Sequence, residues 1–510
     1  MTRAPEYKPL LLTTTMRNPE RFRDFLRVLY EYEGKNLTNA LCEEICGELI
    51  RRGLYRPTRS ITTEIKLKWN SGIHLTDKEV KTLLDENPQD HGEAGFEHGW
   101  PSRFDTQFKL GKFFGFIFYK IGEPVEFSKL GELYIAQSET DGQTLYVNDE
   151  QQIFLNAFAN YHRKNPYQRV LNRNRPLILL IGLLKELEKN TELGSAGLYI
   201  HELPFLLIWK DDNAKELARA LIEFRRKHRF NPSREVVYDY VGKIHGGWIP
   251  TKDKFETITK EYPDDLLRKF RLTGLFSLRG NGSILAINRD LESVADYLID
   301  KHYKVFDFAN EREYFDFVSQ VDHQLISLSK PPVLSGASID QNFLIKWVKE
   351  FTVATIKEEL KILSKNRASS HQILRITPAP LRLEFLASLL IKSRNPEAVV
   401  IANYSRDDEG LPISHAPGNN PDIELHEDNS LSLYEVTLTT GVNQAKTEFA
   451  PITRHLEDKI REGKYRSENI QTILVAPAIH VDFERWTEFI RFKEKKEMSS
   501  LTIDQFVNQT

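Results

Sequence analysis

Two acidic residues in the last fifth of the chain stand where a carboxylate needs a partner. Asp422 follows a proline and begins the segment DIELH, and Glu435 lies inside the apolar segment LYEVTL. Because side chains alternate along a strand, Glu435 shares a face with Leu433 and Thr437. A buried carboxylate is unfavourable without a counter-charge, and a second carboxylate beside it adds repulsion. A divalent cation resolves this conflict, since two carboxylates, a main-chain carbonyl and water form the oxygen-rich shell that suits Mg²⁺.

The chemistry expected of such a cation is hydrolysis of a phosphodiester, because the ion can activate water and stabilise negative charge at phosphorus. Pro-Asp, then a hairpin, then Glu-x-Lys is the PD-(D/E)xK nuclease pattern. Thr437 occupies the position of the lysine. That lysine normally orients and helps to deprotonate the attacking water, or balances charge near the phosphate. Three residues of the following helical segment could take its place: Lys446, Lys459 and His455.

Two more carboxylates lie in the same part of the chain. Glu384 stands between Leu383 and Phe385 on a helix expected over residues 375–394, so it lies on an apolar face. Glu448 lies thirteen residues beyond Glu435, where an exposed helix glutamate is the plain alternative. Both halves of the nuclease pattern are short enough to arise by chance, and these two neighbours give the site more weight.

The segments that must position these residues alternate between helices and short apolar strands. After the helix over 375–394 come the strand AVVIANY, a polar loop, the strands DIELH and SLYEVTLTT, a helical stretch and the strand TILVAPAIH. The polar turn EDNS joins DIELH to LYEVTL, so we expect these two strands to form a hairpin. This alternation predicts an α/β domain with a central sheet.

The N-terminal half is mainly helical by its hydrophobic periodicity. Its first two helices are separated by a short turn, and Thr38 and Gly53 begin and end the second one. Residues 262–288 then form a second compact signal, a helix followed by two strands that a Gly-Asn-Gly turn joins. The first region has the shape of a helix-turn-helix, and the second, with its hairpin, that of a winged helix-turn-helix. That shape is common in DNA binders and also occurs in proteins that bind nothing.

The candidate DNA-contacting residues are basic side chains in these regions. Arg103 is interleaved with aromatic residues in GWPSRFDTQFKLGKFFGFIF, where a basic group suits phosphate contact. A solvated face over a phenylalanine-rich strand explains Arg103 nearly as well. The other candidates stand on the helix and wing of the second region: Arg268, Lys269, Arg271 and Arg279.

Changes of texture along the chain predict its division into parts. Two DNA-recognition subdomains are expected over residues 1–145 and 146–302, followed by a linker over 303–315 and a catalytic domain over 316–510. A chain of 510 residues is too long for one hydrophobic core, which agrees with several domains.

Bulk properties exclude several classes of protein. With 40% hydrophobic and 28% charged residues, the composition is that of an ordinary globular protein. The two cysteines, Cys42 and Cys46, are too few for a disulfide scaffold or a cysteine-rich zinc site, which fits a reducing cytoplasm. No stretch resembles a signal peptide or a membrane-spanning helix. With a net charge of −3, any nucleic acid must be met by a local basic face. No phosphate-binding loop is present, so we expect no use of ATP.

Longer segments carry a specific resemblance. They include TTTMRNPERFRDFL, GELIRRGLY, GWPSRFDTQFKLGKFFGFI, IHELPFLLIWKDD, DDLLRKFRLTGLF and EVTLTTGVNQAKTEFAPITRHL. In these segments, and in the acidic site, the chain resembles the AlwI family of type IIS restriction endonucleases. That family includes MlyI- and PleI-like enzymes and related strand-specific nicking endonucleases. The resemblance covers most of the chain and is far more specific than the nuclease pattern alone.

The resemblance implies a multidomain fold. A mainly α-helical recognition half with winged helix-turn-helix units would precede an α/β, FokI-like PD-(D/E)xK restriction-endonuclease-like domain. It also implies an acidic cluster of Glu384, Asp422, Glu435 and Glu448. Asp422 and Glu435 would be direct Mg²⁺ ligands with the carbonyl of Val436, and Glu384 would complete the shell. Mn²⁺ would be a substitute ion.

The function expected is that of a bacterial, cytoplasmic endonuclease that cuts double-stranded DNA outside a short asymmetric site. One cleavage domain cuts one strand, so a double-strand break needs a transient homodimer or a separate small subunit. Without either, the protein is a nicking enzyme. A cognate DNA methyltransferase is the expected companion. The rival from another class is a non-catalytic DNA-binding protein, against which the retained carboxylates argue.

Overall fold

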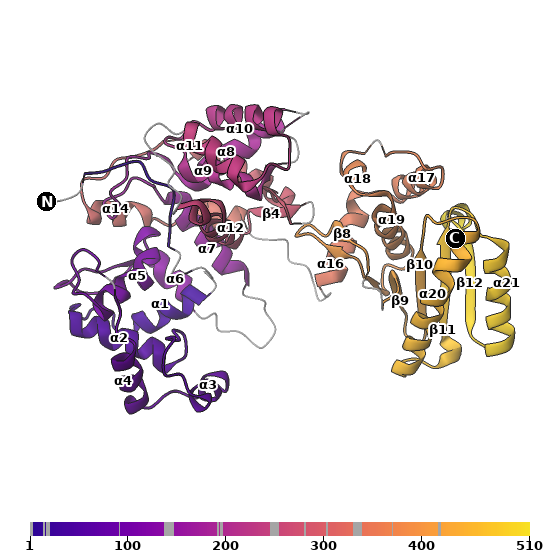
Figure 1. Ribbon diagram of the computed structural model, residues 1–510, viewed down its shortest axis with the longest axis horizontal. Helices are drawn as coiled ribbons and strands as arrows, with labels where there is room; N and C mark the ends of the chain where they lie inside the picture. Colours follow the sequence, from indigo (N-terminus) through magenta and orange to yellow (C-terminus); the bar gives the residue numbers. More distant parts are fainter. Residues whose placement is uncertain are drawn as a thin grey trace. The chain divides into compact units, whose positions relative to one another are not determined.

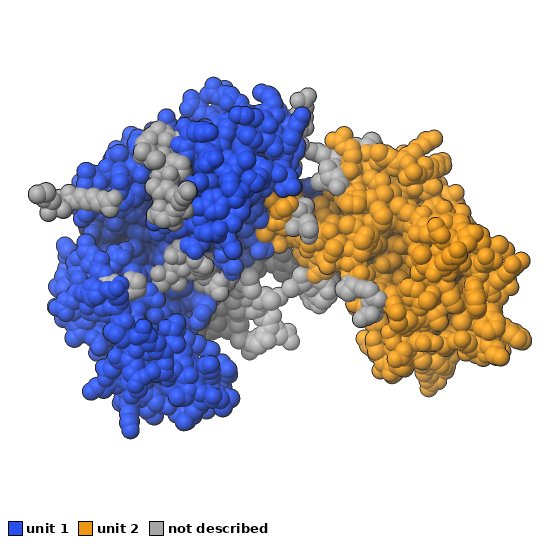
Figure 2. Space-filling view, in the orientation of Figure 1, with its two compact units in different colours: residues 1–277, 284–331 blue, residues 278–283, 332–510 orange. Residues whose placement is uncertain are grey.

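The structure is a computed structural model that describes residues 4–509 except 14–15, 17–20, 91, 137–146, 191–192, 194–196, 245–253, 280–281, 302–303, 330–338, 370 and 417–419. It divides the chain into two compact units (Figure 2). Unit 1 contains Met1–Ser277 and Ile284–Pro331, and unit 2 contains Leu278–Ser283 and Pro332–Thr510.

Unit 1 is built mainly of helices (Figure 1). They are α1 (Phe22–Tyr30), α2 (Asn39–Arg51), α3 (Thr63–Asn70), α4 (Asp77–Glu86), α5 (Trp100–Phe113), α6 (Lys129–Ile135), α7 (Val147–Asn160), α8 (Pro176–Glu188), α9 (Leu203–Ile208), α10 (Ala214–His228), α11 (Arg234–Ile244), α12 (Tyr262–Leu272), α13 (Glu292–Lys301), α14 (Glu311–Val318) and α15 (His323–Leu328). Short strands join them: β1 (Ile117–Phe118), β2 (Glu126–Phe127), β3 (Leu198–Tyr199), β4 (Phe276–Arg279) and β5 (Ile284–Ile287), with β4 crossing into unit 2. Across the described residues, no helix combines the length and the apolar character that a bilayer requires.

Local signals explain where the second helix begins and ends. The side chain of Thr38 accepts a hydrogen bond from the N–H of Leu41 at 3.1 Å, which caps α2. Gly53 follows the helix with a φ of 69°, and a Cβ at this position would lie 2.7 Å from the ring of Trp69. Both predicted boundary signals of α2 are therefore confirmed.

The second compact signal also forms the predicted elements. Tyr262–Leu272 is helix α12, with Pro263 and two aspartates in its first turn. Strands β4 and β5 are neighbours in a three-stranded sheet of order β3-β5-β4. The first two residues of the predicted Gly-Asn-Gly turn, 280 and 281, lie outside the described residues.

The units relate to the predicted domain division as follows. Unit 1 continues to Pro331 and includes α14 and α15, so the residues predicted as a linker, 303–315, lie within it. The predicted boundary at 145/146 lies outside the described residues.

Unit 2 combines a mixed sheet with helices (Figure 1). Its helices are α16 (Ile339–Glu350), α17 (Val353–Ser364), α18 (Gln372–Ile376), α19 (Ala379–Arg394), α20 (Val442–Glu462), α21 (Val481–Phe489) and α22 (Ile503–Asn508). Its strands are β6 (Val399–Ala402), β7 (Ser405–Arg406), β8 (Pro412–Ser414), β9 (Ile423–His426), β10 (Leu431–Val436), β11 (Ile470–Ala476) and β12 (Glu497–Thr502).

The main sheet has the order β12-β11-β10-β9-β6. Strand β10 pairs with β9 in antiparallel and with β11 in parallel orientation, and β6 pairs with β9 in antiparallel orientation. The predicted hairpin is confirmed, because residues 427–430 connect β9 to its antiparallel neighbour β10. The predicted helix over 375–394 is α19, which begins at Ala379 in a segment with prolines on both sides.

Two hydrophobic cores lie on the two faces of this sheet, and they confirm the predicted alternation. Leu433 packs in one core with Ile452 and Leu456 of α20. Tyr434 and Val436 pack in the other core, with residues of α16, α17, α19 and α22. The face that carries Leu433 and Glu435 is therefore the one that α20 covers.

Candidate active site

Asp422 and Glu435 meet at one end of the β9–β10 hairpin. The antiparallel register pairs Tyr434 with Ile423, so Asp422 and Glu435 stand one step beyond the last paired residues. The main-chain N–H of Val436 donates a hydrogen bond to Oδ2 of Asp422 at 2.8 Å. The sequence pattern predicted this pairing of the two acids across the hairpin.

Glu435 is buried, with 7% of its surface exposed. Helix α20 begins after Gly441, whose φ of 70° favours glycine, and brings His455 over the sheet. Nδ1 of His455 lies 2.7 Å from Oε1 of Glu435. Burial raises the pKa of Glu435 above its usual value, while the contact with His455 opposes this rise.

Asp422 is partly buried and carries the strongest electrostatic conflict of the site. Burial raises its pKa well above the usual value, and the negative charges of Glu435 and Glu384 raise it further. The N–H of Val436 acts in the opposite direction. Three carboxyl groups are therefore close enough to repel one another, which a cation would relieve.

Glu384 reaches this group from helix α19, with 3% of its surface exposed. Its Oε1 accepts a hydrogen bond from Nδ1 of His415. Its Oε2 is buried and has no hydrogen-bond partner in the described structure. Burial raises the pKa of Glu384, while His415 and the main-chain N–H of Ala416 lower it. The orphaned oxygen is the strongest sign that a ligand belongs at this position.

The fit of a divalent cation follows from the donor set. Asp422, Glu435 and Glu384 supply oxygen atoms, the donor type that Mg²⁺ prefers. In the described part of the chain, no group of three or more His, Cys, Asp or Glu side chains already has the arrangement of a metal site. Each acid instead accepts a hydrogen bond from the protein. The residues fit the ion by type, and Oε2 of Glu384, which no described residue contacts by a hydrogen bond, gives it a donor.

Glu448 occupies a different place from the other three acids. Its Oε1 accepts a hydrogen bond from the hydroxyl of Thr437 at 3.0 Å. Thr437 also accepts the N–H of Thr439 through the same hydroxyl, at 3.1 Å. Glu448 therefore holds the residue that replaces the usual lysine, and its charge raises the pKa of Asp422.

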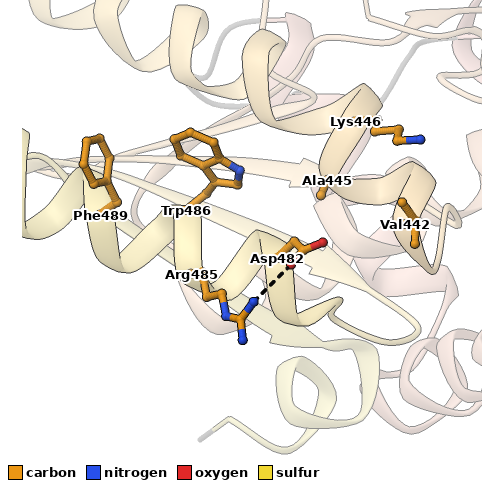
Figure 3. Close-up of a pocket in the computed structure, with 7 residues that line it drawn as sticks. All are labelled: Val442, Ala445, Lys446, Asp482, Arg485, Trp486 and Phe489. Atoms are coloured by element: carbon orange, nitrogen blue, oxygen red, sulfur yellow. Dashed lines mark ion pairs between the residues drawn. The ribbon is translucent and has the colours of Figure 1, made fainter.

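Neither of the two lysines predicted to replace the motif lysine contacts the three acids. Lys446 is exposed and lines a groove of about 500 Å³ with residues of α21 (Figure 3). It stands two positions from Glu448, on the other side of α20, because such neighbours do not share a helix face. Lys459 lies 3.3 Å from Glu424 and 3.2 Å from Glu462. The structure thus brings His455, and neither lysine, to the acids.

Glu424 forms a second polar group on the same face of the sheet. Its Oε2 lies 3.0 Å from Nε2 of His426, and its Oε1 accepts a hydrogen bond from Asn403 at 3.1 Å. Burial would raise the pKa of Glu424, but His426, Asn403 and Lys459 lower it to about 2. Unlike Glu384, whose Oε2 has no partner among the described residues, Glu424 has a partner for each of its two oxygens.

The predicted DNA-contacting residues divide into buried and accessible groups. The structure contradicts the prediction that Lys269 contacts DNA, because its side chain is fully buried. The ammonium group pairs with Asp265 and donates a hydrogen bond to the carbonyl of Thr13 at 3.0 Å. Arg279 lies in unit 2 and pairs with Glu409 at 2.7 Å.

The remaining three candidates are partly or fully accessible. Arg103 donates to the hydroxyl of Tyr55 at 3.0 Å. Arg268 pairs with Asp264 at 3.1 Å and is half exposed. Arg271 is exposed at the end of α12.

Sequence reasoning missed His415, Glu424 and His426. Glu424 and His426 alternate with Asp422 along DIELH, so the period of the strand could have placed all three on one face. His415 lies in a polar loop 31 positions from Glu384 in sequence, and no pattern signals the contact between the two.

Comparisons with known proteins identify the family of the chain. The profile of the family described as AlwI restriction endonuclease matches residues 113–375 and 338–508, more than half of the chain. The protein is therefore a DNA-cleaving hydrolase of the restriction endonuclease class. Within that class, the chain belongs to the AlwI restriction endonuclease family. The predicted family resemblance is confirmed.

Solved structures give weaker likenesses. The small subunit of the heterodimeric restriction endonuclease R.BspD6I is 23% identical over 29% of this chain and 73% of its own, with a TM-score of 0.25. The BpuJ1 endonuclease binding domain is 11% identical over 64% and 97%, with a TM-score of 0.34. Restriction endonuclease FokI is 11% identical over 99% and 95%, with a TM-score of 0.22. No conclusion rests on scores this low. No curated protein sequence matches the chain.

Proposed function

We propose that the protein is a type IIS restriction endonuclease that uses Mg²⁺ to cut DNA at a fixed distance outside a short asymmetric site. The observation that carries this proposal is the group of Asp422, Glu435 and Glu384. Negative charges within it raise the pKa of Asp422 and of Glu384, and one buried oxygen has no hydrogen-bond partner among the described residues. Membership of a restriction endonuclease family supplies the substrate class.

Asp422, Glu435 and Glu384 would hold the ion, with the carbonyl of Val436 as a further donor and Mn²⁺ as a substitute. A bound Mg²⁺ supplies a Lewis acid and a means of lowering the pKa of water. The protein's own residues prepare this place. His455 fixes the carboxylate of Glu435, and the N–H of Val436 fixes that of Asp422. In-line attack of water at phosphorus would leave 5′-phosphate and 3′-hydroxyl ends.

The residue at the lysine position supports a division of labour. Thr437 has no charge, and its hydroxyl is committed to Glu448. His455 is buried against Glu435, so it keeps a basic group beside the carboxylates where the motif usually has lysine. We assign His455 the task of holding Glu435, and Glu448 the task of holding Thr437.

We assign DNA recognition to unit 1 through winged-helix units. The support is the order of elements along the chain, in which helix α12 is followed by the adjacent strands β4 and β5. These two strands belong to a three-stranded sheet in which β5 lies between β3 and β4. Arg268 and Arg271 stand on the accessible side of α12 and would contact phosphates or base edges. The mixed sheet of unit 2 supports a PD-(D/E)xK cleavage domain, since its antiparallel hairpin carries both motif acids.

A double-strand break would need a second cleavage unit, because one site cuts one strand. The surface that supports such a partner is the groove between α20 and α21, lined by Val442, Trp486 and Phe489 (Figure 3). We propose a second copy of this chain as its occupant. A nicking enzyme, or the large subunit of a heterodimer, is the alternative. A DNA methyltransferase of the same specificity would protect the host.

The test is cleavage of supercoiled plasmid with Mg²⁺ or Mn²⁺ by wild type, Asp422→Ala and Glu435→Ala. Discrete linear fragments that both substitutions abolish are expected of a restriction enzyme that uses this site. Open circles alone, equally sensitive to both substitutions, would indicate a nicking enzyme or a missing small subunit. Binding of DNA by the wild type without cleavage would refute the proposal and favour a non-catalytic DNA-binding protein.

A further inference from the structure

The carboxylate of Glu384 is held by a short loop that no sequence motif marks. His415 and Ala416 follow strand β8, and both favour the ionised form of Glu384: the histidine through Nδ1 and the alanine through its main-chain N–H. His415 leaves 58% of its side chain exposed, whereas Glu384 is almost fully buried. The contact therefore fixes one oxygen, Oε1, from the outside of the unit.

The loop is attached to a rigid hairpin. In the turn between β7 and β8, Oδ1 of Asp407 accepts the N–H groups of Glu409 and Leu411, each at 2.9 Å. The carbonyl of Glu409 accepts the indole N–H of Trp347 on α16 at 2.8 Å. Gly410 has a φ of 84° and lies so close to Phe343 that a Cβ would meet its ring at 2.6 Å. His415 thus extends from a hairpin that is anchored to helix α16.

Among the described residues, the other oxygen of Glu384 has no such partner. Oε2 is buried, and no described group forms a hydrogen bond with it. The charge of Glu384 raises the pKa of Asp422, and the charge of Glu435 raises the pKa of Glu384. Holding Oε1 from outside leaves Oε2 as the oxygen of this carboxylate that no described group occupies. A histidine that holds one oxygen of a metal-binding carboxylate does not bind the metal itself. It fixes the orientation of the carboxylate and changes its basicity.

We propose that His415 is a positioning residue for the metal site, clamping Oε1 of Glu384 so that Oε2 is presented to the cation. The inference rests on the proposed function, because it requires a cation between Glu384, Asp422 and Glu435. The competing possibility is that the imidazole of His415 occupies the place of the metal beside Glu384. The ring would then have to move away from the carboxylate before the metal binds. The two possibilities predict opposite effects of removing the ring on metal affinity.

The experiment measures binding of Mn²⁺ alone to the full chain without DNA, by the electron paramagnetic resonance signal of free Mn²⁺. His415→Ala is expected to weaken binding about 10- to 100-fold, the usual effect of losing a second-layer partner. His415→Gln retains a side-chain N–H and is expected to stay within about threefold of wild type. The matched control is His426→Ala, which removes a histidine from Glu424 in the same unit and should leave Mn²⁺ binding unchanged.

The outcomes separate this inference from the proposed function. If wild type binds no Mn²⁺, or if Asp422→Ala binds it equally well, both fall. If wild type binds Mn²⁺ at the acids and His415→Ala binds it equally or more tightly, only the role of His415 falls. An equal loss in His426→Ala would also overturn it, since the effect would then come from the stability of unit 2. Should His415→Ala not fold, His415→Leu fills the space without an N–H and must show the same loss.

Discussion

The three carboxyl groups of the candidate site lower the stability of the folded protein when no metal is bound. Asp422 has a pKa raised by burial and by Glu435 and Glu384, so the folded state favours its protonated form. The stabilising contribution of a raised carboxyl pKa is full below the unfolded value of about 3.9 and is lost as pH rises through the folded value. Repulsion at neutral pH is the consequence, and a neutral side chain should remove it.

Asp422→Asn is therefore expected to raise the free energy of unfolding of the metal-free protein at pH 8 by about 1–3 kcal/mol, while it abolishes cleavage. Thermal unfolding in the presence of a chelator measures the first effect. Asp428→Asn, in the exposed turn between β9 and β10, is the control and should change neither property. A less stable Asp422→Asn protein would show that Asp422 holds the hairpin through Val436 more than it repels its neighbours.

The same shifts predict how metal loading depends on pH. Because the pKa values of Asp422, Glu435 and Glu384 are raised, binding of Mg²⁺ must displace protons that these groups still carry. At low, fixed Mg²⁺ the cleavage rate should rise with pH, and saturating Mg²⁺ should shift the rise to lower pH. Rates measured from pH 5 to 9 at two Mg²⁺ concentrations test this. Identical profiles at both concentrations would contradict it.

The residues of the site were predictable to the extent that strand alternation governs them. The period of two placed Glu435 with Leu433 and set Asp422 across the hairpin, because a one-residue shift would reverse the faces. Lys446 was misplaced because the rotational phase of α20 depends on which residues pack on the sheet. His415 could not be foreseen, since its contact with Glu384 joins residues 31 positions apart through tertiary structure alone.

At the scale of elements, helix α12 shows that a helix with several basic residues does not expose all of them. Its boundaries followed from Pro263 and the acidic first turn. Asp265 and Lys269 are four residues apart and form a fully buried pair, a spacing that the sequence shows but whose burial it does not. Arg268 and Arg271 occupy the accessible side.

This arrangement predicts different effects for neighbouring substitutions. Lys269→Ala removes the ammonium group that pairs with the buried carboxylate of Asp265 and should destabilise unit 1 by about 3–5 kcal/mol. Arg271→Ala should leave stability within about 0.5 kcal/mol of wild type, weaken DNA binding and lower its salt dependence by about one ion. Chemical unfolding and binding titrations at several salt concentrations separate the two. If Lys269→Ala is as stable as wild type but binds DNA more weakly, Lys269 contacts DNA and does not serve mainly to stabilise unit 1.

At the scale of the molecule, the division of the chain into a mainly helical part and a part with a mixed sheet was predictable, and the boundary between them was less so. Helices α14 and α15 are short amphipathic segments that could belong to either unit by composition. Tertiary contacts such as that of the Tyr314 hydroxyl with the carbonyl of Phe113, at 2.8 Å, place them in unit 1. A domain boundary that depends on such long-range contacts cannot be predicted from the local composition and hydrophobic pattern of the sequence.

The groove between α20 and α21 bears on whether one molecule or two cut the DNA. Trp486 and Phe489 are each 47% exposed, and Val442 is 52% exposed, an unusual concentration of large apolar groups on one surface. Asp482 and Arg485, paired at 3.5 Å, border the same groove (Figure 3). A two-fold symmetric contact requires a self-complementary surface, and an apolar centre beside one acidic and one basic group satisfies that requirement. The groove lies on α20, on a different side of this helix from His455 and Glu448. A contact there would place two copies of unit 2 side by side and leave both acidic sites uncovered by the contact.

Double-strand cleavage should therefore depend on protein concentration to a higher order than first-strand nicking does. Trp486→Ser should weaken self-association by at least 2 kcal/mol, about 30-fold, as truncation of a central aromatic anchor does. We expect this variant to accumulate nicked circles at concentrations where wild type yields linear DNA. Phe492→Ser, at an exposed aromatic residue that does not line the groove, should cleave like wild type. Equal loss of nicking and linearisation in Trp486→Ser would instead mean that Trp486, which packs against Phe449, supports α20 and the site within one copy.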